Sequence, residues 1–134
     1  LHFQNLLAGA LLELRLPKIQ AIVPMPISTE RLLERGYNQS LIVAKIMAKQ
    51  LNIPIWQPLI RLQQHSQKGL SRLERLDHIE QQFQISTTSK LRYRRVLILD
   101  DVVTTGSSIH ALKLKLEELG CQKIYAACIA SAES

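Results

Sequence analysis

The sequence predicts an α/β fold in which a mainly parallel, twisted sheet carries helices on both faces. Short apolar segments typical of strands alternate with segments whose apolar residues recur at helical spacing. One apolar segment, residues 95–100, contains four consecutive aliphatic residues, which is typical of a strand buried on both faces of a parallel sheet. The chain has 134 residues, 46% of them hydrophobic, and no internal repeat, so we expect a single domain over residues 1–134.

The first third of the chain predicts two helices around a strand. Residues 5–16 have a helical composition and end at Pro17, which cannot continue a helix. Residues 19–27 predict a short buried strand that two prolines end. A polar, arginine-bearing connection over 28–40 then leads into a helix at 40–51, whose apolar residues lie at helical spacing.

The middle of the chain predicts an edge strand, a polar segment and a capped helix. Residues 53–60 indicate a strand near a sheet edge, because their two prolines cannot donate ladder hydrogen bonds. Residues 61–69 are polar, and we expect them to be mobile. The helix at 71–83 opens with Ser71 and Glu74 in the spacing of a capping box.

The last third predicts strands that alternate with one amphipathic helix. Residues 83–86 form a short strand in this interpretation, and 95–100 form the central buried strand. The helix at 107–120 ends at Gly120, a residue favoured just beyond helix ends. Residues 123–130 indicate a final buried strand.

The candidate site follows the strand at 95–100. In an open parallel sheet, ligands bind outside the carboxyl ends of the strands, and Asp100 and Asp101 lie at such an end. The next loop leads into a helix whose first N–H groups lack helical partners and favour an anion. This loop offers backbone N–H donors and four side-chain hydroxyls. Its residues are Thr104, Thr105, Gly106, Ser107 and Ser108. Carboxylates accept from hydroxyls and the loop donates to phosphate, so the pattern indicates a sugar phosphate, with ribose 5-phosphate as the natural candidate.

A purely structural interpretation of these residues stays open at this point. Either aspartate can be a cap or a solvated strand end, and the loop can be an ordinary turn with Ser107 as the helix N-cap. The segment is not a P-loop, because the lysine of that motif is missing, and it lacks the glycines of the dinucleotide fingerprint.

Three stretches carry a resemblance to a known family. Residues 96–108, VLILDDVVTTGSS, resemble the 5-phosphoribosyl 1-diphosphate (PRPP) motif of type I phosphoribosyltransferases. Residues 21–40 resemble the Val-Pro-x-Pro … Arg-Gly-[Phe/Tyr]-Asn-Gln segment of the subgroup that contains competence protein F (ComF) and GntX. Residues 67–83 resemble its Gln-x-Gly-Leu-Ser segment. The resemblance runs from about residue 1 to the end and implies the type I phosphoribosyltransferase fold.

The resemblance implies roles for the residues at the site. Asp100 and Asp101, the catalytic pair, would contact the ribose 2′ and 3′ hydroxyls near a Mg²⁺ that the diphosphate of PRPP also binds. The 5-phosphate loop would consist of Thr104, Thr105, Gly106, Ser107 and Ser108.

Basic residues elsewhere are candidates for the diphosphate. Arg31 and Arg35 lie where the family has its diphosphate loop, and arginine binds such a group in a bidentate manner. In the family, a flexible loop at the position of residues 61–75 closes over PRPP. The resemblance therefore implies that Lys68, Arg72 and Arg75 belong to a basic lid. The alternatives are a solvated basic turn for the first pair and surface charges of a capped helix for Arg72 and Arg75.

The implied reaction displaces diphosphate from C1 of PRPP with a nitrogen nucleophile. The alternatives are a sensor that binds PRPP or a nucleotide without turnover, and a protein of the same fold that binds single-stranded DNA. The ComF subgroup is associated with natural competence, and DNA or DNA-processing proteins are therefore candidate partners. The net charge of +6 fits an anionic partner, whereas the 4% aromatic content fits base stacking poorly.

The remaining features concern location and chain context. Cys121 and Cys128 form neither a CxxC pair nor a disulfide framework, which is typical of thiols in a reducing cytoplasm. No apolar run approaches the roughly 20 residues of a membrane span, so we expect a cytoplasmic protein. The chain begins without Met, which favours a start inside a longer protein; the resemblance implies an upstream zinc-finger segment.

Overall fold

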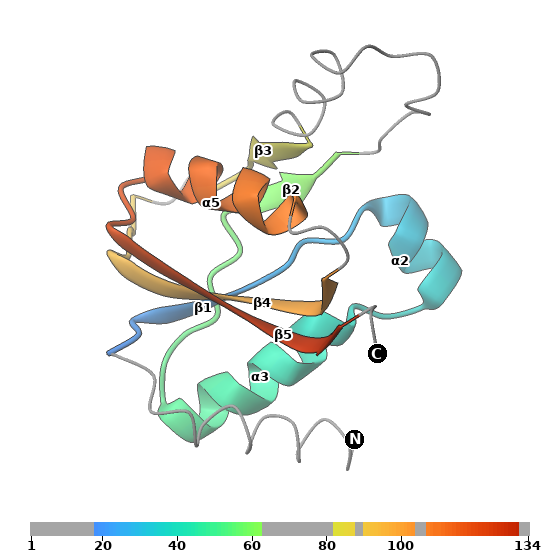
Figure 1. Ribbon diagram of the computed structural model, residues 1–134, viewed down its shortest axis with the longest axis horizontal. Helices are drawn as coiled ribbons and strands as arrows, with labels where there is room; N and C mark the ends of the chain where they lie inside the picture. The colour runs from blue at the N-terminus through green and yellow to red at the C-terminus, as the bar shows by residue number, and fades with distance from the viewer. Residues whose placement is uncertain (1–17, 63–81, 88–89, 104–106, 132–134) are drawn as a thin grey trace.

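The computed structural model describes residues 18–62, 82–87, 90–103 and 107–131 (Figure 1). Within these residues the strands are β1 (Ala21–Pro24), β2 (Leu59–Arg61), β3 (Phe83–Ile85), β4 (Arg95–Val103) and β5 (Lys123–Ser131). The helices are α2 (Thr29–Arg35), α3 (Gln39–Leu51) and α5 (Ser107–Glu118). The helices predicted at 5–16 and 71–83 lie outside the described residues.

The sheet is parallel, as the alternation of strands and helices predicts. Its order is β1-β4-β5, with β4 in the centre, and both pairings are parallel. Figure 1 shows α3 on one side of this sheet and α5 on the other. The prediction of a parallel sheet between two helical layers is confirmed.

The apolar residues of β4 alternate between two cores. Leu97 and Leu99 pack with Val43 and Met47 of α3. On the opposite face Val96 and Ile98 pack in the cluster that contains Leu112 and Leu116 of α5. All of these β4 side chains have no exposed surface, which explains why the segment shows no polar alternation.

The segment predicted as one strand at 53–60 is divided in two. Ile55 forms an isolated parallel bridge with Ile22 at the edge of the sheet. The chain then leaves the sheet, and β2 pairs with β3 in a separate antiparallel pair. Prolines at 54 and 58 cannot donate ladder hydrogen bonds, and this limits continuous pairing across the segment.

The connection predicted at 28–40 contains a helix, α2, and that expectation was wrong. Ser28 caps its start by accepting from the backbone N–H of Arg31 at 3.3 Å. Gly36 ends it in the left-handed conformation, with φ 79°. No residue of α2 is buried, so the sequence carries no apolar stripe that could have indicated a packed helix. Asn38 caps the next helix, α3, because its side chain accepts from the backbone N–H of Leu41 at 3.4 Å.

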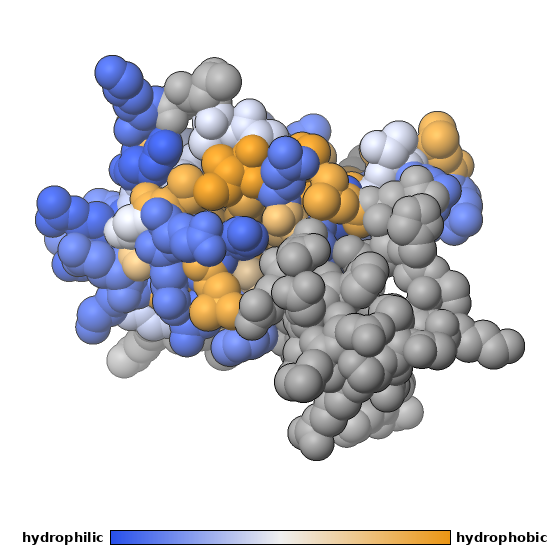
Figure 2. All heavy atoms as spheres, turned by 90° about the horizontal axis from the view of Figure 1, so that it is seen from above, coloured by the Kyte–Doolittle hydropathy of each residue, from blue (hydrophilic) through white to orange (hydrophobic). Residues whose placement is uncertain are grey.

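Some large apolar side chains remain exposed. Leu33 on α2 is 80% exposed, and Ile60 on β2 is 47% exposed. Figure 2 shows apolar side chains bordered by hydrophilic ones on the face seen from above. None of the helices among the described residues is both long enough and apolar enough to span a membrane.

Candidate functional site

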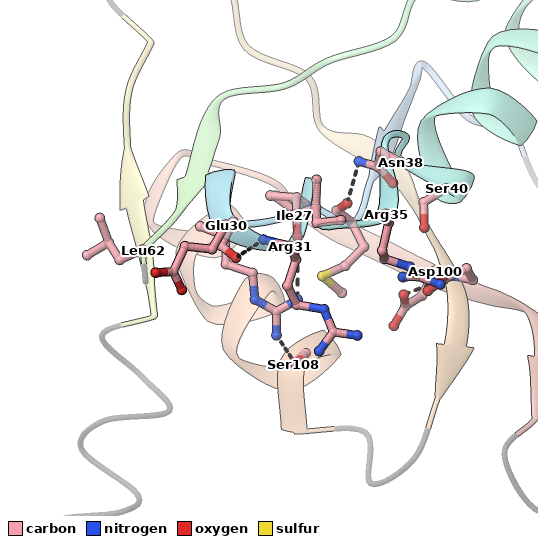
Figure 3. A pocket seen from close by; sticks show the side chains of 14 residues that line it. Ile27, Glu30, Arg31, Arg35, Asn38, Ser40, Leu62, Asp100 and Ser108 are labelled. Atoms are coloured by element: carbon pink, nitrogen blue, oxygen red, sulfur yellow. Dashed lines mark hydrogen bonds and ion pairs between the residues drawn. The ribbon is translucent and has the colours of Figure 1, made fainter. Parts of the chain in front are cut away.

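A cavity of about 630 Å³ opens beside the carboxyl end of β4 (Figure 3). Its wall comes from the segment after β1, from α2, from the start of α3, from the end of β2, and from the first turn of α5. Three separate parts of the sequence, 25–40, 61–62 and 108, therefore meet the two aspartates at the edge of the sheet where ligands bind in open α/β folds.

Asp100 is a buried carboxyl group in this wall. Its side chain lies on the central strand and the residue is only 7% exposed. One carboxyl oxygen accepts from the backbone N–H of Asp101 at 2.8 Å. Burial, with a smaller contribution from the neighbouring Asp101, raises the pKa of Asp100 to about 6, whereas Arg61 acts in the opposite direction. A ligand that brings hydroxyl donors or a cation to this buried carboxyl group stabilises its charged form.

Asp101 faces helix α2. Its Oδ2 lies 3.3 Å from Nη1 of Arg35, in an ion pair whose side chains are 20% and 39% exposed. Arg31, one turn earlier on α2, also lines the cavity. The structure thus brings both arginines predicted for the diphosphate into the same cavity as the carboxylates.

Arg61 is a cavity residue that the sequence analysis missed. It was assigned to a polar, mobile segment, but it is the last residue of β2 and is half-buried. Its Nη2 donates to Ser108 Oγ at 2.7 Å and to Gln82 Oε1 at 2.9 Å. Its guanidinium carbon lies 5.4 Å from the centre of the Phe83 ring. The missed signal was a charged residue directly after an apolar run, the same signal that identified Asp100.

The electrostatic setting of Arg61 is unusual for an arginine. Burial lowers its pKa; among the nearby charges Asp100 raises it, Arg31 lowers it and Asp101 raises it. Within the part of the chain that the structure describes, Arg61 makes no ion pair and is held by neutral acceptors.

The remaining predicted residues divide into two groups. Ser108 lies in the first turn of α5 and lines the cavity, and α5 begins at Ser107. The others lie outside the described residues: Thr104, Thr105, Gly106, Lys68, Arg72 and Arg75.

The donor set of the cavity fits a Mg²⁺ that arrives with a phosphorylated ligand. Among the described residues no group of three or more His, Cys, Asp or Glu side chains could hold a metal. Asp100 and Asp101 nevertheless offer carboxylate oxygens, and Mg²⁺ is commonly bound by one or two carboxylates together with substrate phosphates.

The two cysteines lie apart from each other. Cys121 is buried, and burial raises the pKa of its thiol to about 11. Cys128 stands on β5 opposite Asp100, and its thiol donates to the backbone carbonyl of Asp101 at 3.9 Å; neither cysteine forms a disulfide.

Comparison with known proteins defines the class. The model of the phosphoribosyl transferase domain family matches residues 38–134. The chain therefore belongs to the phosphoribosyl transferase domain family. Purine phosphoribosyltransferase from Pyrococcus horikoshii has a similar fold, with a TM-score of 0.58 at 21% identity over 97% of this chain and 70% of that one. Glutamine PRPP amidotransferase from Bacillus subtilis gives a TM-score of 0.65 at 15% identity, over 96% of this chain and 26% of that one.

Curated relatives narrow the class to the competence proteins. Competence protein F of Haemophilus influenzae is 33% identical over 115 residues, which are 84% of this chain and 49% of that protein. Competence protein ComFC of Bacillus subtilis is 33% identical over 99 residues, 74% of this chain and 39% of that protein. The resemblance to the ComF family is thus confirmed, while the chain spans half or less of the length of these relatives.

Proposed function

We propose that the cavity binds PRPP together with Mg²⁺, and that the chain is the phosphoribosyltransferase domain of a ComF-type protein. The observation that carries the proposal is one cavity that combines a buried carboxyl group at the end of β4 with arginines from α2 and β2. A ligand with hydroxyls and phosphates satisfies both kinds of group, whereas a simple anion would be repelled by the aspartates.

In this proposal each part of PRPP meets a different part of the wall. Asp100 and Asp101 accept from the ribose 2′ and 3′ hydroxyls. The start of α5 and the loop before it, with Thr104, Thr105, Gly106, Ser107 and Ser108, hold the 5-phosphate. Arg31 and Arg35 face the diphosphate, and Lys68, Arg72 and Arg75 form a lid over it.

The reaction that suits this arrangement is displacement of diphosphate from C1 of the ribose by a nitrogen nucleophile. The carboxylates orient the ring, and the arginines stabilise the negative charge that develops on the leaving diphosphate. Bound Mg²⁺ would supply further neutralisation of the diphosphate charge.

The direct alternatives share the fold. A sensor would bind PRPP or a nucleotide at the same cavity without turnover. A DNA-binding protein would use the basic surface instead, a candidate supported by the net charge of +6 and by relatives named as competence proteins. Its affinity for single-stranded DNA would fall steeply with salt, and Asp100→Asn would leave that affinity unchanged or raise it. A cytoplasmic role in DNA uptake, alone or with DNA-processing proteins, belongs to this proposal as well.

Titration calorimetry with PRPP and Mg²⁺ tests the proposed function. The protein is compared with Asp100→Asn/Asp101→Asn and with a matched control, Glu117→Gln/Glu118→Gln, which removes two exposed carboxylates from the far end of α5. We expect binding by the wild type and the control but not by the site variant. A thermal melt provides a second readout, because ligand at 100 times Kd stabilises by about 2.7 kcal/mol. No binding by the wild type at low salt would refute the proposal and leave DNA as the leading partner.

A further inference from the structure

The fold holds the guanidinium of Arg61 in place through neutral hydrogen-bond partners, and the carboxylates of Asp100 and Asp101 act on its charge without forming an ion pair with it. Gln82, which is 5% exposed, accepts from Nη2, and Phe83, which is 2% exposed, lies against the guanidinium. The carbonyl of Pro26 accepts from Nη1 at 3.4 Å. All of these partners are neutral, while the guanidinium itself stays charged at any physiological pH.

A partly desolvated cation with neutral partners is a favourable place for an anion. A negative group that arrives beside the guanidinium recovers a further part of the free energy lost when it left water. The surroundings that fix the plane of the side chain also reduce the entropy cost of binding that group. Arg35 differs in this respect, because it already has an anionic partner in Asp101.

The position of Arg61 identifies which part of the ligand it meets. Its Nη2 donates to Ser108 Oγ at 2.7 Å, so an anion bound at the first turn of α5 lies within reach of the same nitrogen. The Arg35–Asp101 pair joins α2 to β4 instead. Two arginines of the cavity therefore have different partners: Arg61 contacts Ser108 and Arg35 contacts Asp101.

We propose that Arg61, together with Ser108, is a specificity-determining residue for a phosphomonoester, the 5-phosphate of the ribose ligand, and that it does not serve the diphosphate. This inference rests on the proposed function and adds to it a residue from a strand 47 positions before Ser108 in the sequence. It makes Arg61 the reason why the cavity distinguishes a phosphorylated ribose from an unphosphorylated one.

Two probes, ribose 5-phosphate and Mg-diphosphate, distinguish the proposed role of Arg61 from that of Arg35. Each probe is titrated into the wild type, Arg61→Gln and Arg35→Gln. Loss of a charge-assisted hydrogen bond corresponds to roughly a tenfold to hundredfold loss of affinity. We expect Arg61→Gln to lose this much affinity for ribose 5-phosphate while its affinity for Mg-diphosphate stays within about twofold. Arg35→Gln should show the opposite pattern. An unchanged affinity of Arg61→Gln for ribose 5-phosphate, or an equal loss for both probes, overturns the inference.

Further variants control for folding. Ser108→Ala removes one acceptor of Arg61, and Arg61→Lys keeps the charge but not the planar fork. We expect Arg61→Lys to retain an intermediate affinity for ribose 5-phosphate, which a purely structural role would not produce. Titration of PRPP with Mg²⁺ into the wild type separates the two failures. Where the wild type does not bind PRPP, the proposed function falls and the inference with it. Where PRPP binds but the two probes do not separate, only the inference falls.

Discussion

The end of β4 and helix α2 contribute opposite charges to one cavity, and they are held in very different ways. Asp100 stands on a strand that is paired on both sides, and its residue is 7% exposed. Helix α2 has seven residues, none of them buried, and its ends are fixed by Ser28 and Gly36. The negative charge of Asp100 is therefore built into the core at a cost in stability, whereas the positive charges of Arg31 and Arg35 stand on a helix that can open at little cost. In the proposed binding mode, Asp100, assigned to the ribose, is therefore held more firmly than the helix assigned to the diphosphate.

The largest effect should come from the core behind Asp100. Ile98 lies two residues earlier on β4 and has no exposed surface. Ile98→Ala removes buried methylene and methyl groups and leaves a cavity, so we expect the free energy of unfolding to fall by about 2–5 kcal/mol. The matched variant Leu33→Ala, on α2, should change it by less than about 0.5 kcal/mol, because that side chain is 80% exposed. Chemical denaturation measures both, and equal losses would contradict the contrast between the two regions.

Asp100→Asn should stabilise the ligand-free protein, and the effect should depend on pH. The pKa of Asp100 is raised from 3.8 to about 6, so the folded state binds the proton more tightly than the unfolded state. Wild-type stability therefore falls as pH rises from about 4 to about 6, and stays lowered above that. One pKa unit corresponds to about 1.4 kcal/mol, so the variant should gain up to about 3 kcal/mol at pH 7.5 and nothing below pH 4.

Unfolding in urea at several pH values between 4 and 7.5 checks this expectation. Only the difference between the two proteins is interpreted, because carboxyl groups remote from position 100 contribute equally to both. The Asp101 N–H can still donate to an amide oxygen at position 100, which removes a lost hydrogen bond as an explanation. A difference that does not vary with pH would show that burial of the charge is not its cause.

The sequence predicted those parts of the fold that depend on continuous apolar patterns. The strand at β4 and the helix at α5 follow directly from runs of aliphatic residues and from helical spacing. Helix α2 could not be predicted in this way, because Leu32 and Leu33 face solvent and form no buried stripe. Its signal was local, in the serine and glycine caps at its two ends.

The site was predictable only where neighbouring residues in the sequence form it. Asp100 and Asp101 are adjacent, and the rule for carboxyl ends of strands places them at the cavity. The contact of Arg61 with Ser108 joins two segments 47 residues apart, and that of Arg35 with Asp101 spans 66 residues. No local pattern specifies such pairs, because they depend on how β2 and α2 pack against the sheet.

Gly36→Ala should weaken α2 without unfolding the protein. Gly36 has φ 79°, and a Cβ there would meet no atom within 4 Å, so the cost is conformational strain alone. A non-glycine residue in this region costs about 1–2 kcal/mol. Since α2 buries no residue, we expect faster hydrogen exchange of its amides and an almost unchanged Tm. A clear fall in the Tm would show that α2 unfolds together with the core.

Arg35→Gln should have the smallest effect on stability and an informative effect on binding. The Arg35–Asp101 pair is partly exposed, so its loss should change the free energy of unfolding by less than about 1 kcal/mol. Binding of PRPP requires this pair to open if Asp101 turns to the ribose and Arg35 to the diphosphate. The variant should therefore bind Mg-diphosphate roughly tenfold to hundredfold more weakly, and ribose 5-phosphate no more weakly than the wild type does. An equal loss of both affinities would mean that Arg35 acts by holding Asp101 in position, and α2 would then belong to the rigid part of the site.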